Sequence, residues 1–130
     1  MAETLVVDAS AMVDFLVDTT IGKQVRDRLV STDVHVPAHF DAEVLSALGR
    51  LHRAGDLTEQ EVEERVGLIA EAPIRRHLLA PLLQGAWRRH HNVRIVDALY
   101  IELATQIDAK IITTDAGMAS ASTLAELLQT

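Results

Sequence analysis

The sequence contains no cysteine, and this absence excludes several kinds of chemistry at once. Disulfide bonds, thiolate zinc sites and cysteine nucleophiles are all ruled out, which fits a protein of the reducing cytoplasm. Long apolar runs are also missing, because no stretch approaches the ~18 residues that a membrane-spanning helix needs. The first residues lack the basic and apolar segments of a secretory signal peptide. We therefore expect a soluble, cytoplasmic protein with no membrane partner.

Positive charge is scarce: 12 Lys and Arg residues stand against 19 Asp and Glu, which leaves a formal net charge of −7. This balance excludes a protein that binds nucleic acid through the charge of its whole surface. It does not exclude a nucleic-acid enzyme whose surplus acids are metal ligands. The basic residues are clustered, at Arg50 and Arg53 and again at Arg88, Arg89 and Arg94. Any one such cluster is more often a solvated helix face than a binding site.

What remains is the composition of an ordinary folded domain. Apolar residues make up 48% of the chain and charged residues 24%, which excludes a disordered protein. A length of 130 residues allows one domain with a substantial core but not two, so we expect a single domain over residues 1–130. The glycine-rich phosphate loops of dinucleotide-binding and ATP-binding proteins are absent, so any phosphate chemistry must rest on other groups.

Short apolar strands alternate with amphipathic helices along the chain. We expect strands at 5–7, 33–36, 74–78 and 110–113, the third as an edge strand or loop because its centre is Arg-Arg-His. We expect helices at 11–17 and 22–30, after an N-cap at Asp41, after the capping box at Thr58, after Pro81, and at 96–107. Residues 116–128 are expected to be helical in part, with little sign of a final strand. This alternation predicts an α/β fold with a mainly parallel sheet.

Four acids stand where strands end or helices begin. Asp8 and Asp115 each follow an apolar strand, whereas Glu43 and Asp97 each lie in the first turn of a predicted helix. Each acid also has an ordinary structural explanation, as a helix N-cap or as a first-turn carboxylate that the helix dipole favours. As a set they share a location, because strand ends and helix starts meet at one edge of a parallel sheet.

Carboxylates gathered at one place repel each other, so a fold tolerates them only when cations or a substrate relieve the repulsion. Oxygen ligands select hard ions such as Mg²⁺ or Mn²⁺, and two such ions would balance four carboxylates. Carboxylate-held Mg²⁺ mostly serves phosphoryl transfer, by lowering the pKa of a bound water and stabilising the leaving oxygen. Ser10 and Thr113 are small hydroxyls beside the acids that suit a supporting role, although cap and turn roles are equally open.

The same residues resemble the PIN domain family and, within it, the VapC-type toxin ribonucleases. Val7-Asp8-Ala9-Ser10 resembles the family's first strand with its acid, and Pro37 followed by Glu43-Val44 resembles the helix that carries the second acid. The run from Val96-Asp97-Ala98-Leu99-Tyr100 to Ala104 is similar to the family's Asp-Ala-x-Tyr-x-x-x-Ala helix, which is the most specific match. Ile112-Thr113-Thr114-Asp115 resembles the Thr-x-Asp that closes the site.

The resemblance implies a Rossmann-like three-layer α/β/α sandwich and Mg²⁺- or Mn²⁺-dependent endonucleolytic cleavage of RNA. It also implies a homodimer and a cognate VapB-type antitoxin that blocks the site. By this resemblance the metal ligands are Asp8, Glu43, Asp97 and Asp115, with Ser10 and Thr113 in support. The clustered arginines Arg50, Arg53, Arg88, Arg89 and Arg94 become candidates for gripping the RNA backbone. One departure is Gly117, which stands where many relatives carry a further acid.

Two alternatives stay open from the sequence. A metal-dependent phosphoesterase that acts on DNA or a small nucleotide would use the same acids, and a comparison of RNA with DNA cleavage separates it from a ribonuclease. A catalytically silent α/β module would use the acids only as helix caps and would bind another protein. The absence of any Mn²⁺ effect on the melting temperature would favour this second alternative.

Overall fold

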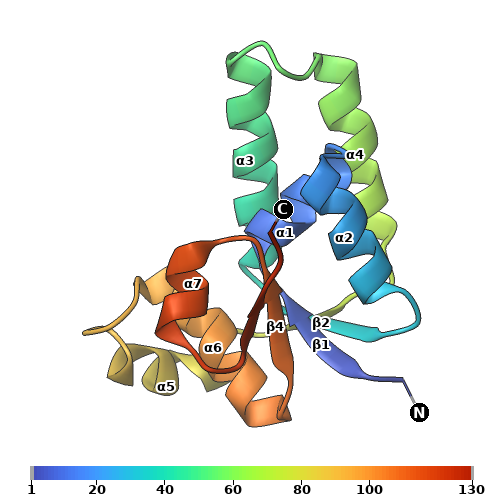
Figure 1. Cartoon of the computed structure of the whole chain (residues 1–130). Coiled ribbons are helices and arrows are strands. Elements are labelled where there is room, and N and C mark those ends of the chain that lie inside the picture. The colour runs from blue at the N-terminus through green and yellow to red at the C-terminus, as the bar shows by residue number, and fades with distance from the viewer. Residues whose placement is uncertain (1, 130) are drawn as a thin grey trace.

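The computed structural model describes residues 2–129, which form a parallel sheet between two layers of helices (Figure 1). The strands are β1 (Thr4–Val7), β2 (Asp33–Pro37), β3 (Arg75–His77), β4 (Lys110–Thr113) and β5 (Ala125–Leu127). They follow one another across the sheet in the order β3-β2-β1-β4-β5, and every pairing is parallel. The predicted three-layer, Rossmann-like α/β fold is confirmed, and β3 is the edge strand that its basic residues indicated.

Which face of the sheet a helix covers depends on the direction in which the chain crosses the sheet. From β1 to β2 and β3 the chain moves one way, through α1 (Ala9–Leu16), α2 (Thr20–Leu29), α3 (Phe40–Arg53) and α4 (Glu59–Glu71). From β3 to β4 and β5 it moves the other way, through the short 3₁₀ helix η1 (Ala80–Leu82), α5 (Leu83–Arg88), α6 (Ile95–Ile107) and α7 (Ala116–Ala121). Because such crossovers are right-handed, the two groups lie on opposite faces. No helix within residues 2–129 is long and apolar enough to cross a lipid bilayer.

The two central strands, β1 and β4, form the middle of the core. Val6 pairs with Ile111 and Val7 with Ile112, and all four side chains are fully buried. Continuous apolar runs are typical of strands that are covered on both faces. The register aligns the carboxyl ends of β1 and β4, so the residues that follow these strands lie next to each other. This alignment positions Asp8 beside the segment that follows Ile112.

The predicted caps mostly hold, and they fix where the helices begin and end. Thr58 and Glu61 form the expected capping box, in which each side chain accepts a hydrogen bond from the other residue's backbone N–H. Gly55 follows α3 with a φ of +86°, a backbone conformation that glycine adopts without strain. Asp8 caps α1 and Asp115 caps α7 through their side chains. These caps place both acids at the carboxyl edge of the sheet.

Two local expectations are wrong. Asp41 is not the N-cap of α3, because the helix already begins at Phe40, a fully buried residue, and Asp41 instead forms an ion pair with Arg76 at 2.7 Å. Residues 116–128 are helical in part, as expected, through α7, but a final strand, β5, follows this helix where little sign of one was expected. Only three residues form β5, too few for a periodic pattern to be visible in the sequence.

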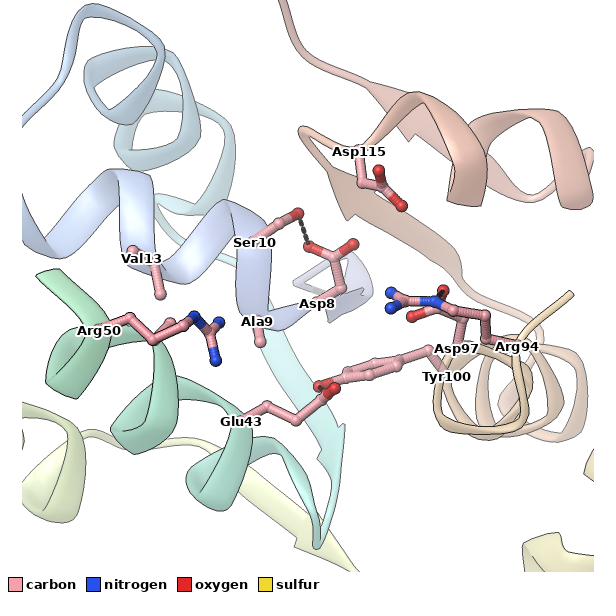
Figure 2. A pocket seen from close by; sticks show the side chains of 11 residues that line it. Asp8, Ala9, Ser10, Val13, Glu43, Arg50, Arg94, Asp97, Tyr100 and Asp115 are labelled. Atoms are coloured by element: carbon pink, nitrogen blue, oxygen red, sulfur yellow. Dashed lines mark hydrogen bonds and ion pairs between the residues drawn. The ribbon is translucent and has the colours of Figure 1, made fainter.

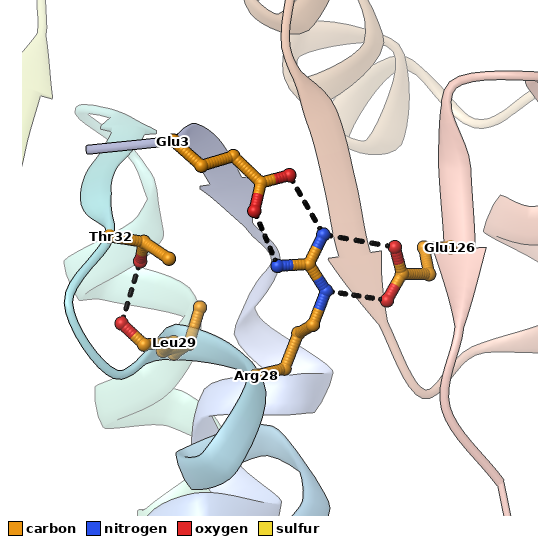
Figure 3. Close-up of polar contacts among 5 residues, drawn as sticks. All are labelled: Glu3, Arg28, Leu29, Thr32 and Glu126. Carbon is orange, nitrogen blue, oxygen red and sulfur yellow. Dashed lines mark hydrogen bonds and ion pairs between the residues drawn. The ribbon is translucent and has the colours of Figure 1, made fainter. Parts of the chain in front are cut away.

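A charged clamp holds β5 and the start of β1 together (Figure 3). Arg28 of α2 donates hydrogen bonds to Glu126 in β5, the shorter at 2.7 Å, and to both carboxylate oxygens of Glu3, at 2.8 and 2.9 Å. The hydrogen bond from Arg28 is the main reason that the pKa of Glu3 is lowered. Strand β5, at the other edge of the sheet, is therefore held by the Arg28 side chain from α2 as well as by its hydrogen bonds with β4.

Candidate functional site

A pocket of about 390 Å³ opens at the carboxyl edge of the sheet (Figure 2). It lies between the first turns of α1, α3 and α6 and the segment that follows β4. The acids that line it are the four singled out from the sequence, Asp8, Glu43, Asp97 and Asp115. They come from four separate elements of the chain, and the parallel topology brings them to one place.

Asp8 is the most buried of these acids, with 4% of its surface exposed. Its carboxylate accepts hydrogen bonds from the backbone N–H of Ala11 at 3.0 Å, from Ser10 Oγ at 2.8 Å and from Thr113 Oγ1. Burial raises the pKa of Asp8 to about 6, the hydrogen bonds oppose this shift, and the charge of Asp115 adds a little to it. Near neutral pH the protein therefore holds a buried, poorly solvated negative charge, which a cation would stabilise.

Ser10 and Thr113, the two hydroxyls singled out from the sequence, both donate hydrogen bonds to Asp8. Thr113 is fully buried, and while it donates to Asp8 its hydroxyl accepts a hydrogen bond from the backbone N–H of Asp115 at 3.0 Å. Asp115 in turn accepts from the backbone N–H of Met118 at 3.1 Å. A single hydroxyl thus links the two acids that follow β1 and β4.

Glu43 is oriented by Tyr100, a residue that the site prediction did not include. The Tyr100 hydroxyl donates to Glu43 Oε1 at 2.7 Å, and His39 Nε2 lies 3.4 Å from the same oxygen. Tyr100 is almost fully buried, and this burial, together with the charge of Glu43, raises its pKa, so it remains a proton donor. The signal for Tyr100 was its position three residues after Asp97, which places both on one face of α6.

Asp14 is a second residue that the sequence reasoning missed. It lies four residues after Ser10 on α1, a spacing that places the two side chains on the same helix face. Asp14 accepts hydrogen bonds from Thr114 Oγ1 at 2.9 Å and from Thr19 Oγ1 at 3.0 Å, and Thr114 Oγ1 lies 3.2 Å from Ser10 Oγ. A chain of polar groups therefore extends behind Asp8, away from the pocket.

The predicted arginines separate into two groups. Arg50 and Arg94 line the pocket, and Arg94 forms an ion pair with Asp97 at 3.1 Å, Nε to Oδ2. Arg53, Arg88 and Arg89 are not among the lining residues within 2–129. Arg89 instead forms an ion pair with Glu102 on α6 at 3.1 Å. The pocket thus combines four carboxylates with two guanidinium groups.

The donor set suits a divalent cation, although the side chains are not arranged around one. Within residues 2–129, no three acidic or histidine side chains form a ready-made cage for an ion. Three of the carboxylates have internal partners instead: Thr113 and Ser10 for Asp8, Tyr100 for Glu43, and Arg94 for Asp97. Oxygen-only ligands and a buried negative charge fit Mg²⁺ or Mn²⁺ and do not fit a soft metal.

The profile of the PIN domain matches residues 5–124. The chain therefore belongs to the PIN domain family, and the resemblance drawn from its motifs is confirmed. It is 51% identical over 120 residues to Ribonuclease VapC3 of Mycobacterium tuberculosis, an alignment that covers 92% of this chain and 88% of the relative. It is 32% identical over 120 residues to Ribonuclease VapC12 of the same organism, covering 88% of this chain and 89% of the relative. These relatives identify the chain as a VapC-type PIN domain.

Solved structures share the fold at much lower identity. The crystal structure of M. tuberculosis VapC20, described as a Sarcin-Ricin loop cleaving toxin, superposes with a TM-score of 0.69 at 16% identity, over 91% of this chain and 95% of that one. A toxin–antitoxin complex from Klebsiella pneumoniae gives a TM-score of 0.64 at 10% identity, over 94% and 95% of the two chains. At these identities the likeness concerns the arrangement of strands and helices.

Proposed function

We propose that this protein is a VapC-type toxin, an endoribonuclease that hydrolyses RNA phosphodiester bonds with the help of Mg²⁺ or Mn²⁺. One observation carries the proposal: four acids from four separate elements line a single pocket at the carboxyl edge of the sheet. The ribonuclease names of relatives at 51% and 32% identity support the choice of RNA as the substrate.

In this proposal Asp8, Glu43, Asp97 and Asp115 hold the metal. A divalent ion held there would supply a lowered pKa for a water molecule and charge stabilisation for the leaving oxygen of the phosphodiester. Ser10 and Thr113 keep the Asp8 carboxylate in a fixed orientation, and Tyr100 does the same for Glu43. Arg50 and Arg94 supply positive charge at the pocket, where an RNA phosphate needs it.

The partners that we propose are an antitoxin of VapB type that blocks the pocket and a second copy of the chain. Exposed apolar side chains support protein contacts, since Leu78, Leu83 and Trp87 are 78%, 55% and 62% exposed. A separate, largely apolar groove lies between α1, α2 and α4 and includes Phe15, Leu29 and Leu68 in its lining. The Klebsiella neighbour is a toxin–antitoxin complex, which supports an antitoxin as the partner.

The test is a cleavage assay on RNA and DNA of the same sequence, with Mn²⁺ and with EDTA. We expect cleavage of RNA only, dependent on the metal and abolished in Asp97→Asn. The matched control is Asp41→Asn, which makes the same chemical change on an acid that lies outside this pocket. Metal-dependent cleavage that survives in Asp97→Asn would reject the site. Cleavage of DNA would favour the general phosphoesterase. If neither nucleic acid is cleaved and Mn²⁺ does not change the melting temperature, the silent module would be favoured.

A further inference from the structure

Two arginines line the carboxylate pocket, and of these Arg94 alone forms an ion pair with a carboxylate within residues 2–129. It stands at the N-cap position of α6 without capping it through its side chain, and its side chain turns to Asp97, one helical turn later. Figure 2 shows the guanidinium beside Asp97, directed toward the side of the pocket where Asp8 lies. Arg94 also lines the two neighbouring hollows, one beside Asp115 and the other beside Glu43.

The Arg94 guanidinium therefore interacts electrostatically with several carboxylates of the pocket and not with Asp97 alone. Asp97 is the main cause of a raised pKa for Arg94, and Asp115 and Glu43 add to the shift. A positive charge in this position reduces the repulsion among acids that the fold has brought together. In the metal-free protein, Arg94 does what a bound cation would otherwise do.

Arg94 is also loosely held. Its side chain is 75% exposed, and its one hydrogen bond within the described residues goes to Asp97. Arg28, in contrast, is 24% exposed and donates to two carboxylates. A side chain with so few contacts can rotate into solvent without breaking the packing of the core.

We propose that Arg94 is an internal counter-ion of the metal-free pocket, which must leave Asp97 before a divalent ion can be held there. The inference rests on the proposed function, because it assumes that these carboxylates bind a metal. Its basis is competition: a guanidinium and a divalent cation that share the carboxylate of Asp97 repel each other. Under this proposal, the ion pair between Arg94 and Asp97 stabilises the metal-free protein and lowers its affinity for the metal.

Calorimetric titration of the metal-free protein with Mn²⁺ alone tests this competition without any use of cleavage activity. Arg94→Gln removes the competing charge, and we expect it to bind Mn²⁺ roughly five-fold more tightly, the size of a single exposed ion pair. Arg94→Lys keeps a competing cation and should bind close to the wild type. The matched control is Arg50→Gln, which removes a positive charge from the same pocket but one that hydrogen-bonds to Ser46, not to a carboxylate.

Arg50→Gln should change the Mn²⁺ affinity by less than about two-fold, because only the long-range field of the charge is lost. Equal gains in Arg94→Gln and Arg50→Gln would overturn the inference, since a general field effect would then suffice. An unchanged affinity in Arg94→Gln would overturn it as well and would leave the metal site intact. A wild-type protein that does not bind Mn²⁺ at all would refute the proposed metal site together with this inference.

The metal-free state supplies a second readout. Arg94→Gln should melt below the wild type in EDTA, because the acids have lost their counter-ion, and should gain more from Mn²⁺ than the wild type does. A variant that is destabilised equally in EDTA and in Mn²⁺ would mean that Arg94 has only a structural role.

Discussion

Replacing Asp8 with Asn should stabilise the metal-free protein at neutral pH, although it removes a residue that we place in the metal site. Asp8 is 4% exposed, and burial raises its pKa from 3.8 to about 6. A carboxyl whose pKa is higher in the folded state than in the unfolded state binds its proton more tightly when folded. Ionisation of Asp8 therefore destabilises the fold. The penalty is small below pH 4, grows between about pH 4 and pH 6, and is complete above that range.

The size of the effect follows from the shift. About two pKa units correspond to roughly 3 kcal/mol of unfolding free energy above pH 6. Asn cannot ionise and remains a good N-cap for α1. It cannot accept hydrogen bonds from both Ser10 and Thr113 as the carboxylate does, and the loss of one such bond costs about 1 kcal/mol. The net gain expected at pH 7.5 is therefore about 2 kcal/mol, whereas near pH 4 the variant should be slightly less stable than the wild type.

Urea denaturation in EDTA at pH 4 and at pH 7.5 measures both values. Other titrating groups are common to the two proteins, so the difference between wild type and variant isolates Asp8. The control is Asp27→Asn on α2, whose side chain is 75% exposed and lies outside the pocket, and it should show no comparable swing. If Asp8→Asn gains no stability between pH 4 and pH 7.5, the buried carboxylate is not destabilising and the reasoning fails.

Two further predictions concern the side chains that hold the site and the sheet. Tyr100→Phe removes the hydrogen-bond donor to Glu43. This change should lower the unfolding free energy measured in urea by about 1 kcal/mol and weaken Mn²⁺ binding measured by calorimetry about ten-fold. An unchanged Mn²⁺ affinity would show that Glu43 does not need Tyr100 to orient it. Arg28→Ala removes the clamp on β5, so hydrogen exchange at the Leu128 amide, which bonds to the Thr113 carbonyl, should accelerate roughly five-fold. Exchange at the wild-type rate would mean that the ladder with β4 holds β5 alone.

Much of the fold could be predicted from the sequence because its strongest signals are local and agree with one another. The apolar run before Asp8, the capping box at Thr58 and the glycine at 55 each determine a boundary through short-range chemistry. The start of α3 could not be predicted in this way. Phe40 is drawn into the core and into the helix, and this tertiary burial outweighs the preference of Asp41 for the N-cap.

The candidate site was predictable as a set of acids and less so as a network. Parallel topology alone brings Asp8, Glu43, Asp97 and Asp115 to one edge, so their shared location follows from where strands end and helices begin. The partners of these acids depend on side-chain directions that no local pattern encodes. The roles of Tyr100 toward Glu43 and of Arg94 toward Asp97 became visible only through distances of 2.7 and 3.1 Å.

The sequence left open whether the acids are helix caps or metal ligands, and the structure indicates that the two roles are compatible. A cap needs one oxygen of a carboxylate: Asp115 accepts from the Met118 amide through Oδ2, and Asp8 accepts from the Ala11 amide through Oδ1. The cap leaves the second oxygen of each carboxylate unused, although in Asp8 that oxygen, Oδ2, accepts a hydrogen bond from Thr113. The cap also holds the side chain in one orientation, so less side-chain conformational entropy would be lost when an ion binds. For Asp8 and Asp115, helix capping is therefore compatible with the metal-binding role that we propose, and the two explanations need not compete.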